Sequence, residues 1–138
     1  MRGTGDAAAV AGARAGQSGA LALSAAGDAL LVSLAKYLRD RLGPDETLYR
    51  LGGDEFVALK THAESREEGL AFGQFLCDAV LAFETPVTGE IKVGASVGVS
   101  VSPEDGTSAA QLLSRADLAM YAAKRSGRNL SLGFTSDM

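Results

Sequence analysis

The apolar residues of this chain recur at two spacings, and each spacing predicts a different kind of element. Between residues 28 and 42 most leucines lie three or four positions apart, which places them on one helix face, and Gly43-Pro44 ends that pattern. Two short alternating runs, residues 47–51 and 55–60, flank a Gly-Gly pair and predict a tight β-hairpin. Residues 91–101 are rich in alternating valines and small residues, which predicts another strand.

Two serines mark the beginnings of two further helices. Ser65 is followed three residues later by Glu68, which is a capping box, and apolar residues at helical spacing continue beyond it. Ser108 begins a last helix that Gly127 ends, and residues 129–134 are expected to form a final strand. This order predicts an α/β (α+β) fold, in which helices pack on a mixed, mainly antiparallel sheet.

Residues 1–26 differ from the rest because Gly, Ala and Ser dominate them and large side chains are almost absent. Such a segment buries little apolar surface per residue, so we expect it to be degenerate or poorly ordered. Residues 19–23 are its candidate strand. Residues 27–138 are long enough for one globular domain with its own core.

Composition narrows the possible partners. A net charge of −4 gives no basic footprint for nucleic acid or for an anionic membrane. No apolar run has the length of a membrane span, and the start of the chain lacks the basic-then-apolar order of a signal peptide. The single cysteine, Cys77, fits a reducing compartment and a buried apolar position. We therefore expect a cytoplasmic domain that contacts neither nucleic acid nor membrane.

The predicted hairpin tip carries two adjacent acids, Asp54 and Glu55, directly after Gly52 and Gly53. A turn needs glycine for its backbone, but it does not need a second acid, and two bare glycines allow a ligand to approach closely. Acids on such a turn suit a hard divalent cation and phosphates. Taken alone, the same residues also fit an ordinary solvated turn.

The stretch from Arg50 to Phe56, RLGGDEF, is identified as the signature of the GGDEF family, the diguanylate cyclases. Further stretches resemble the family in the same order along the chain: residues 26–31, 95–100, 103–106 and 116–129. The resemblance implies a ferredoxin-like palm related to nucleotide cyclases. It also implies the condensation of two GTP molecules to cyclic di-GMP by a homodimer, with Mg²⁺ or Mn²⁺ as the cofactor.

The resemblance assigns roles to individual residues. Asp54 and Glu55 match the acids at the metal and near the attacking hydroxyl, and Gly52 and Gly53 match the turn that the nucleotide approaches. Lys124 and Arg128 match the pair that contacts the triphosphate, and Asp28 matches the acid that reads the guanine edge. Considered singly, Lys124 and Arg128 also fit basic residues at a helix C-terminus, and Asp28 also fits an N-cap.

The chain departs from the family at two further sites. Counting back from Asp28 by the family's usual spacing places Ala11 at a second metal Asp and Gly19 at an Asn for guanine. The product-feedback motif Arg-x-x-Asp reads Gly43-Pro44-Asp45-Glu46, so its Arg is missing. We therefore expect weak or absent turnover and no high-affinity feedback binding of cyclic di-GMP.

The family's first strand lies in the middle of the sheet, so some segment must fill its place. The candidates are residues 7–11 and 19–23, and the alternation of Leu21 and Leu23 favours the second. Residues 83–86, 91–96 and 103–106, with the ending 133–138, resemble GGDEF domains fused ahead of an EAL phosphodiesterase. The alternative function is thus an inactive GTP-sensing or dimerisation module that regulates such a domain.

Overall fold

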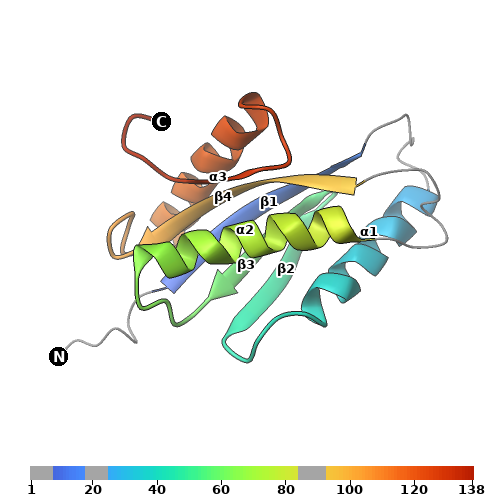
Figure 1. Ribbon diagram of the computed structural model, residues 1–138, viewed down its shortest axis with the longest axis horizontal. Coiled ribbons are helices and arrows are strands. Elements are labelled where there is room, and N and C mark those ends of the chain that lie inside the picture. Colours follow the sequence, from blue (N-terminus) through green and yellow to red (C-terminus); the bar gives the residue numbers. More distant parts are fainter. Residues whose placement is uncertain (1–7, 18–24, 84–92) are drawn as a thin grey trace.

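A computed structural model describes residues 8–17, 25–83 and 93–138 (Figure 1). Its elements follow one another as β1 (Ala8–Gln17), α1 (Ala25–Arg39), β2 (Glu46–Gly52), β3 (Glu55–Lys60), α2 (Arg66–Ala82), β4 (Val93–Ser102), α3 (Ala109–Arg125) and β5 (Ser131–Gly133). The strands form one sheet in the order β2-β3-β1-β4-β5. All neighbouring strands are antiparallel except β4 and β5, which are parallel. The mixed, mainly antiparallel sheet predicted from the sequence is confirmed.

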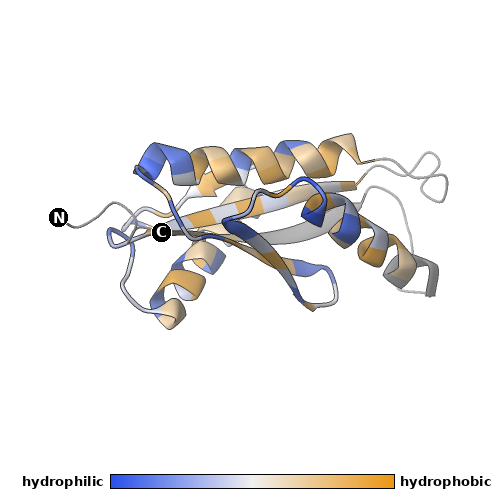
Figure 2. Cartoon of the chain, turned by 90° about the horizontal axis from the view of Figure 1, so that it is seen from below, coloured by the Kyte–Doolittle hydropathy of each residue, from blue (hydrophilic) through white to orange (hydrophobic). Residues whose placement is uncertain are grey.

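Helices cover both faces of this sheet. A large core lies between one face and the helices α1 and α2, whereas a small cluster of Val10, Leu112 and Ala116 lies under α3 on the other face. Figure 2 shows the sheet nearly edge-on, with α2 and α3 on opposite sides. The side that α1 and α2 share therefore supplies most of the apolar burial, which is the main favourable contribution to folding.

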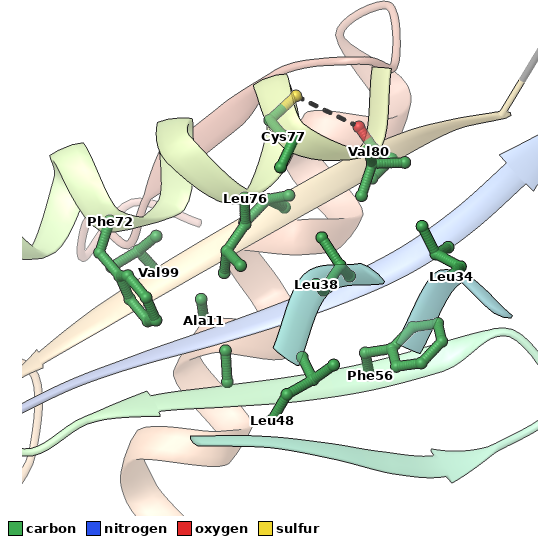
Figure 3. Packing of buried hydrophobic residues seen from close by; sticks show 14 of the residues in the cluster. Ala11, Leu34, Leu38, Leu48, Phe56, Phe72, Leu76, Cys77, Val80 and Val99 are labelled. Carbon is green, nitrogen blue, oxygen red and sulfur yellow. Dashed lines mark hydrogen bonds between the residues drawn. The ribbon is translucent and has the colours of Figure 1, made fainter. Parts of the chain in front are cut away.

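The large core joins α1 to the hairpin strands and α2 to the centre of the sheet. In Figure 3, Leu38 of α1 lies near Leu48 of β2, and Leu34 lies near Phe56 of β3. Cys77 of α2 is fully buried, and its thiol donates a hydrogen bond to the Ala95 carbonyl at 3.7 Å. Burial raises the pKa of the Cys77 thiol, so this cysteine behaves as the small buried residue that the sequence indicated.

The central strand is β1, and it begins much earlier in the chain than expected. Ala8–Gln17 pairs with β3 on one side and with β4 on the other. The prediction that residues 19–23 fill this place is wrong, and those residues lie outside the described part of the chain. The small side chains, from which we expected poor order, fit the centre of the sheet, where Ala9 and Ala11 are completely buried. Pairing on both sides overrides a weak strand propensity.

The helix caps agree with the sequence, but α1 is displaced. Ser65 Oγ accepts from Glu68 N at 3.2 Å, and Ser108 Oγ accepts from Gln111 N at 3.1 Å. Helix α1 begins at Ala25, so Asp28 stands in its first turn and the N-cap interpretation of this residue is wrong. The predicted end at residue 42 is also too late, because tighter turns replace the helix after Arg39.

Candidate functional site

The hairpin tip has the backbone that its glycines allow. Gly52 has a φ of 152° and Gly53 a φ of 53°, and the pairing of β2 with β3 shifts by one residue between Arg50 and Gly52. Arg50 Nε donates to the Gly53 carbonyl at 2.9 Å, which ties the strand to its own turn. A φ like the 152° of Gly52 is easily adopted only by a residue without a β-carbon. The turn chemistry predicted from the sequence is therefore present.

The turn is open on the side where these glycines lack side chains. A β-carbon added to Gly52 or to Gly53 would meet nothing within 4 Å. Asp54 and Glu55 follow directly, and both are half-buried. A phosphate group could thus approach the bare backbone beside two carboxylates.

The register of the sheet places the end of α3 level with this tip. Glu55 of β3 stands opposite Arg14 of β1, and Arg14 stands opposite Ser96 of β4. Two residues earlier in β4, the side chain of Asn129 lies directly against Gly94. Neighbouring strands are about 4.8 Å apart and β4 is two strands from β3, so Gly94 and the Asn129 side chain lie roughly 10 Å across the sheet from β3.

Lys124 and Arg128 consequently lie at the same end of the sheet as the hairpin acids. Lys124 is in the last turn of α3 and half-buried, whereas Arg128 is exposed in the turn that follows. The Arg128 amide donates to the Ala123 carbonyl at 3.1 Å, which folds the turn back onto the helix. The neighbouring Arg125 instead lies over the Tyr121 ring, 5.6 Å from its centroid.

Asp28 also reaches this end of the molecule. Phe56 is two residues nearer the tip than Ala58, which pairs with Leu48. Because Leu38 lies near Leu48 and Leu34 near Phe56, following α1 backwards leads towards the tip (Figure 3). The first turn of α1, which contains Asp28, comes six residues before Leu34. The backbone thus brings the helix start, the hairpin tip and the α3 exit to one end of the sheet.

The central strand adds no acid to this site. Its ten residues contain neither aspartate nor glutamate, and the residue opposite Glu55 is Arg14. Ala11 pairs with Ala58 and Val99 and is fully buried beneath α1 and α2. It stands three residues from the Glu55 row, which is about 10 Å along the strand. Ala11 thus lies away from the hairpin acids in this register, and its match to the family's metal Asp by spacing stays a prediction.

Two further observations limit what the described residues can do. No group of three or more His, Cys, Asp or Glu side chains in the described ranges is arranged to hold a metal ion. None of the helices formed by those residues has the length and apolarity needed to cross a bilayer. A divalent ion at the tip would therefore take few ligands from the described residues and could take others from water or phosphate.

The two acids in the segment that matches the feedback motif form an ion cluster with Lys60. Lys60 Nζ lies 3.3 Å from an Asp45 carboxylate oxygen and 3.1 Å from one of Glu46. Glu46 also accepts from the Gly43 amide at 2.8 Å. Burial alone lowers the pKa of Lys60, but the hydrogen bonds and charges of Glu46 and Asp45 outweigh it and raise that pKa. Both acids of the motif are thus engaged within the domain.

Sequence reasoning missed the contact between Gly94 and Asn129. It assigned residue 129 to the final strand, which in fact begins at Ser131. Arg128 and Asn129 both have positive φ, at 63° and 53°. The adjacent Gly127 and the tolerance of asparagine for this conformation were the available signals.

Comparisons with known proteins agree with this geometry. A family model described as "Diguanylate cyclase, GGDEF domain" matches residues 24–130. An uncharacterized signaling protein of Caulobacter vibrioides is 38% identical over 114 residues, which are 82% of this chain and 14% of that protein. The bifunctional diguanylate cyclase/cyclic di-GMP phosphodiesterase MucR of Pseudomonas aeruginosa is 36% identical over 81% of this chain and 16% of its own length.

A solved structure shows the same fold. The GGDEF domain of TpbB, or YfiN, from Pseudomonas aeruginosa superposes with a TM-score of 0.80 at 27% identity, covering 94% of this chain and 83% of that one. The chain thus matches most of that isolated domain but only about a sixth of the length of these curated relatives.

Proposed function

Because this chain belongs to the GGDEF family, the diguanylate cyclase domains of cyclic di-GMP signalling, we propose that its hairpin tip binds GTP with Mg²⁺ or Mn²⁺. One observation carries the proposal: the bare Gly52-Gly53 turn, its two acids and the Lys124/Arg128 pair lie at one end of the sheet. Acids for a cation beside bases for phosphate are the two halves of a metal–nucleotide site.

Each residue has a distinct part in this binding. Asp54 and Glu55 would hold the divalent ion, which neutralises phosphate charge when it is bound. Gly52 and Gly53 admit the phosphates to the backbone. Lys124 offers them a point charge, and Arg128 offers a planar fork that matches two phosphate oxygens. Asp28 at the start of α1 would accept hydrogen bonds from a guanine edge.

We further propose that turnover to cyclic di-GMP is weak or lost. Among the described strands, only the hairpin contributes acids at this end, since the residue of β1 that pairs with Glu55 is Arg14. Mg²⁺ can keep waters in place of a missing ligand, so nucleotide binding survives better than in-line attack, which depends on geometry. Any turnover would need a homodimer, because two GTP molecules must meet.

The second candidate function is regulation of a fused domain. A relative that carries both cyclase and phosphodiesterase activities, and is about six times longer than the match, favours this candidate. In that setting the domain would be a cytoplasmic GTP sensor or dimerisation module attached to an EAL-type phosphodiesterase. It would shift the activity of its neighbour without consuming GTP.

Calorimetric titration with GTP and Mg²⁺ tests the binding proposal. We expect measurable binding, a rise in melting temperature by mass action, and loss of most of the metal-dependent part in Asp54→Asn. The control Asp78→Asn removes an acid of α2 that accepts a hydrogen bond from Gln74 in its own helix, and it should bind as the wild type does. No binding at millimolar GTP would overturn the binding proposal and the GTP-sensor form of the second candidate.

A further inference from the structure

The turn that leaves α3 adopts an uncommon backbone conformation. Gly127, Arg128 and Asn129 have φ values of 130°, 63° and 53° in succession. Glycine adopts such values freely and asparagine tolerates them, but a long side chain such as that of arginine rarely does. Something in the surrounding structure must hold Arg128 in this conformation.

The turn is held on both sides by backbone hydrogen bonds. The Arg128 amide donates to the Ala123 carbonyl at 3.1 Å, and the Leu130 carbonyl accepts from the Val97 amide at 3.0 Å. These two contacts fix the turn to α3 at its start and to β4 at its end. Asn129 lies in sequence between the two residues that make these hydrogen bonds.

The side chain of Asn129 rests on Gly94, near the beginning of β4. A β-carbon on Gly94 would stand 1.8 Å from Asn129 Oδ1 and 2.7 Å from its Cγ. Real β-carbons do not approach other atoms so closely, so the missing side chain of Gly94 is what makes room for Asn129. Gly94 thereby determines how closely the turn of residues 127–129 packs against the sheet.

This contact is level with the hairpin tip. Gly94 pairs with Gly16 of β1, two residues beyond the row that contains Ser96, Arg14 and Glu55. Glu55 is the first residue of β3 after the turn, and its pair with Arg14 is the last that β1 makes with β3 at this end. Arg128 is thus anchored, through its neighbour, at the height where phosphates would meet the bare turn.

We propose that Asn129, seated on Gly94, is a positioning residue that presents Arg128 to the phosphate groups of the bound nucleotide. The inference rests on the proposed function and names a residue on which that function depends. Asn129 needs no contact with the nucleotide for this role, because it acts through the backbone of Arg128.

The test is a double-mutant cycle read by calorimetric titration with GTP and Mg²⁺. Asn129→Gly keeps the positive φ accessible and removes the seat on Gly94, so GTP affinity should fall on the order of tenfold, as for one charge-assisted hydrogen bond. In the Arg128→Ala background the same change should have little further effect, because residues that act as one unit are not additive. A purely structural role would lower the melting temperature and leave this coupling absent.

Gly94→Ala provides an independent check. Its methyl group would displace Asn129, so affinity should fall in the single variant, whereas Gly94→Ala/Asn129→Gly should bind no worse than Asn129→Gly alone. Gly12→Ala, whose β-carbon meets Ala116 only at ordinary contact distances of 3.8 Å and more, is the matched control.

The outcomes separate the two proposals. The positioning role would be overturned if Asn129→Gly bound GTP with wild-type affinity, or if it lost the same affinity with and without Arg128. The proposed function would still stand in that case, provided that Lys124→Ala loses GTP binding. Absence of GTP binding in the wild type would overturn both.

Discussion

At the hairpin tip, single residues decide which parts of the backbone a ligand can reach. Gly53 has a left-handed φ of 53°, and neither it nor Gly52 has a neighbour within 4 Å of where a β-carbon would be. Leu51, just before them, is 65% exposed because the shift in strand pairing displaces it. The turn therefore combines a backbone open to ligands with acids that follow at once in sequence.

Lys60 makes the stability of the fold depend on pH in the alkaline range. Its folded-state pKa is raised above the ordinary value of 10.5, because Glu46 and Asp45 outweigh the lowering effect of burial. A pKa raised by folding stabilises the protein fully below the unfolded-state pKa, and this contribution is lost as the pH rises through the folded-state value. The stability difference between wild type and Lys60→Gln should thus hold up to about pH 9 and shrink above about pH 10.5.

Urea unfolding of both proteins across this pH range measures that difference. Lys36→Gln is the control, since Lys36 pairs with Asp40 on an exposed helix surface and such pairs contribute little. A difference between wild type and Lys60→Gln that stays unchanged at pH 12 would contradict the prediction.

At the scale of elements, helix α3 can pack closely against the sheet because Gly98 of β4 has no side chain. A β-carbon on Gly98 of β4 would stand 2.1 Å from the Met120 amide nitrogen and 2.2 Å from the Ala116 carbonyl oxygen. Both atoms belong to the helix backbone and cannot move aside singly. Gly98→Ala should therefore cost more than about 3 kcal/mol of unfolding free energy.

The control for this change lies on the neighbouring strand. Gly12 faces the same helix, but a β-carbon there would be 3.8 Å from the nearest atom, so Gly12→Ala should change stability by less than about 1 kcal/mol. Chemical denaturation of the two variants decides the matter. Equal losses would show that the spacing between α3 and the sheet adjusts freely.

The elements that the sequence predicted are those with a local signal. The hairpin has its Gly-Gly turn, and α2 and α3 have serine caps, so each could be placed without its neighbours. Strand β1 has no such signal, because Ala and Gly carry no periodicity and its strand conformation comes from β3 and β4 on either side. The contact of Asn129 with Gly94 was equally hidden, since it joins residues 35 positions apart only after the sheet has formed.

At the scale of the whole molecule, the register of the central strand bears on catalysis. Two acids come from one hairpin, and the strand beside it contributes none, because Arg14 occupies the position opposite Glu55 and Ala11 lies in the core. Under the proposed function, the metal-binding half of the site would thus be incomplete, whereas the phosphate-binding half would keep Lys124 and Arg128. This imbalance favours binding of nucleotide over its conversion.

The last prediction follows from that imbalance: the chain incubated with GTP and Mg²⁺ or Mn²⁺ should form little or no cyclic di-GMP. Chromatography of the products measures this, and robust turnover that disappears in Glu55→Gln would contradict it.

The strand register supplies a sharper pair of variants. Arg14→Asp places a carboxylate opposite Glu55, where facing β-carbons are about 5 Å apart, and should strengthen the Mg²⁺-dependent part of GTP binding. Ala11→Asp instead buries a charge in the core, so it should lower the melting temperature without that gain. If Ala11→Asp were the variant that gained metal-dependent binding, the strand register, and with it the account of the missing ligand, would be wrong.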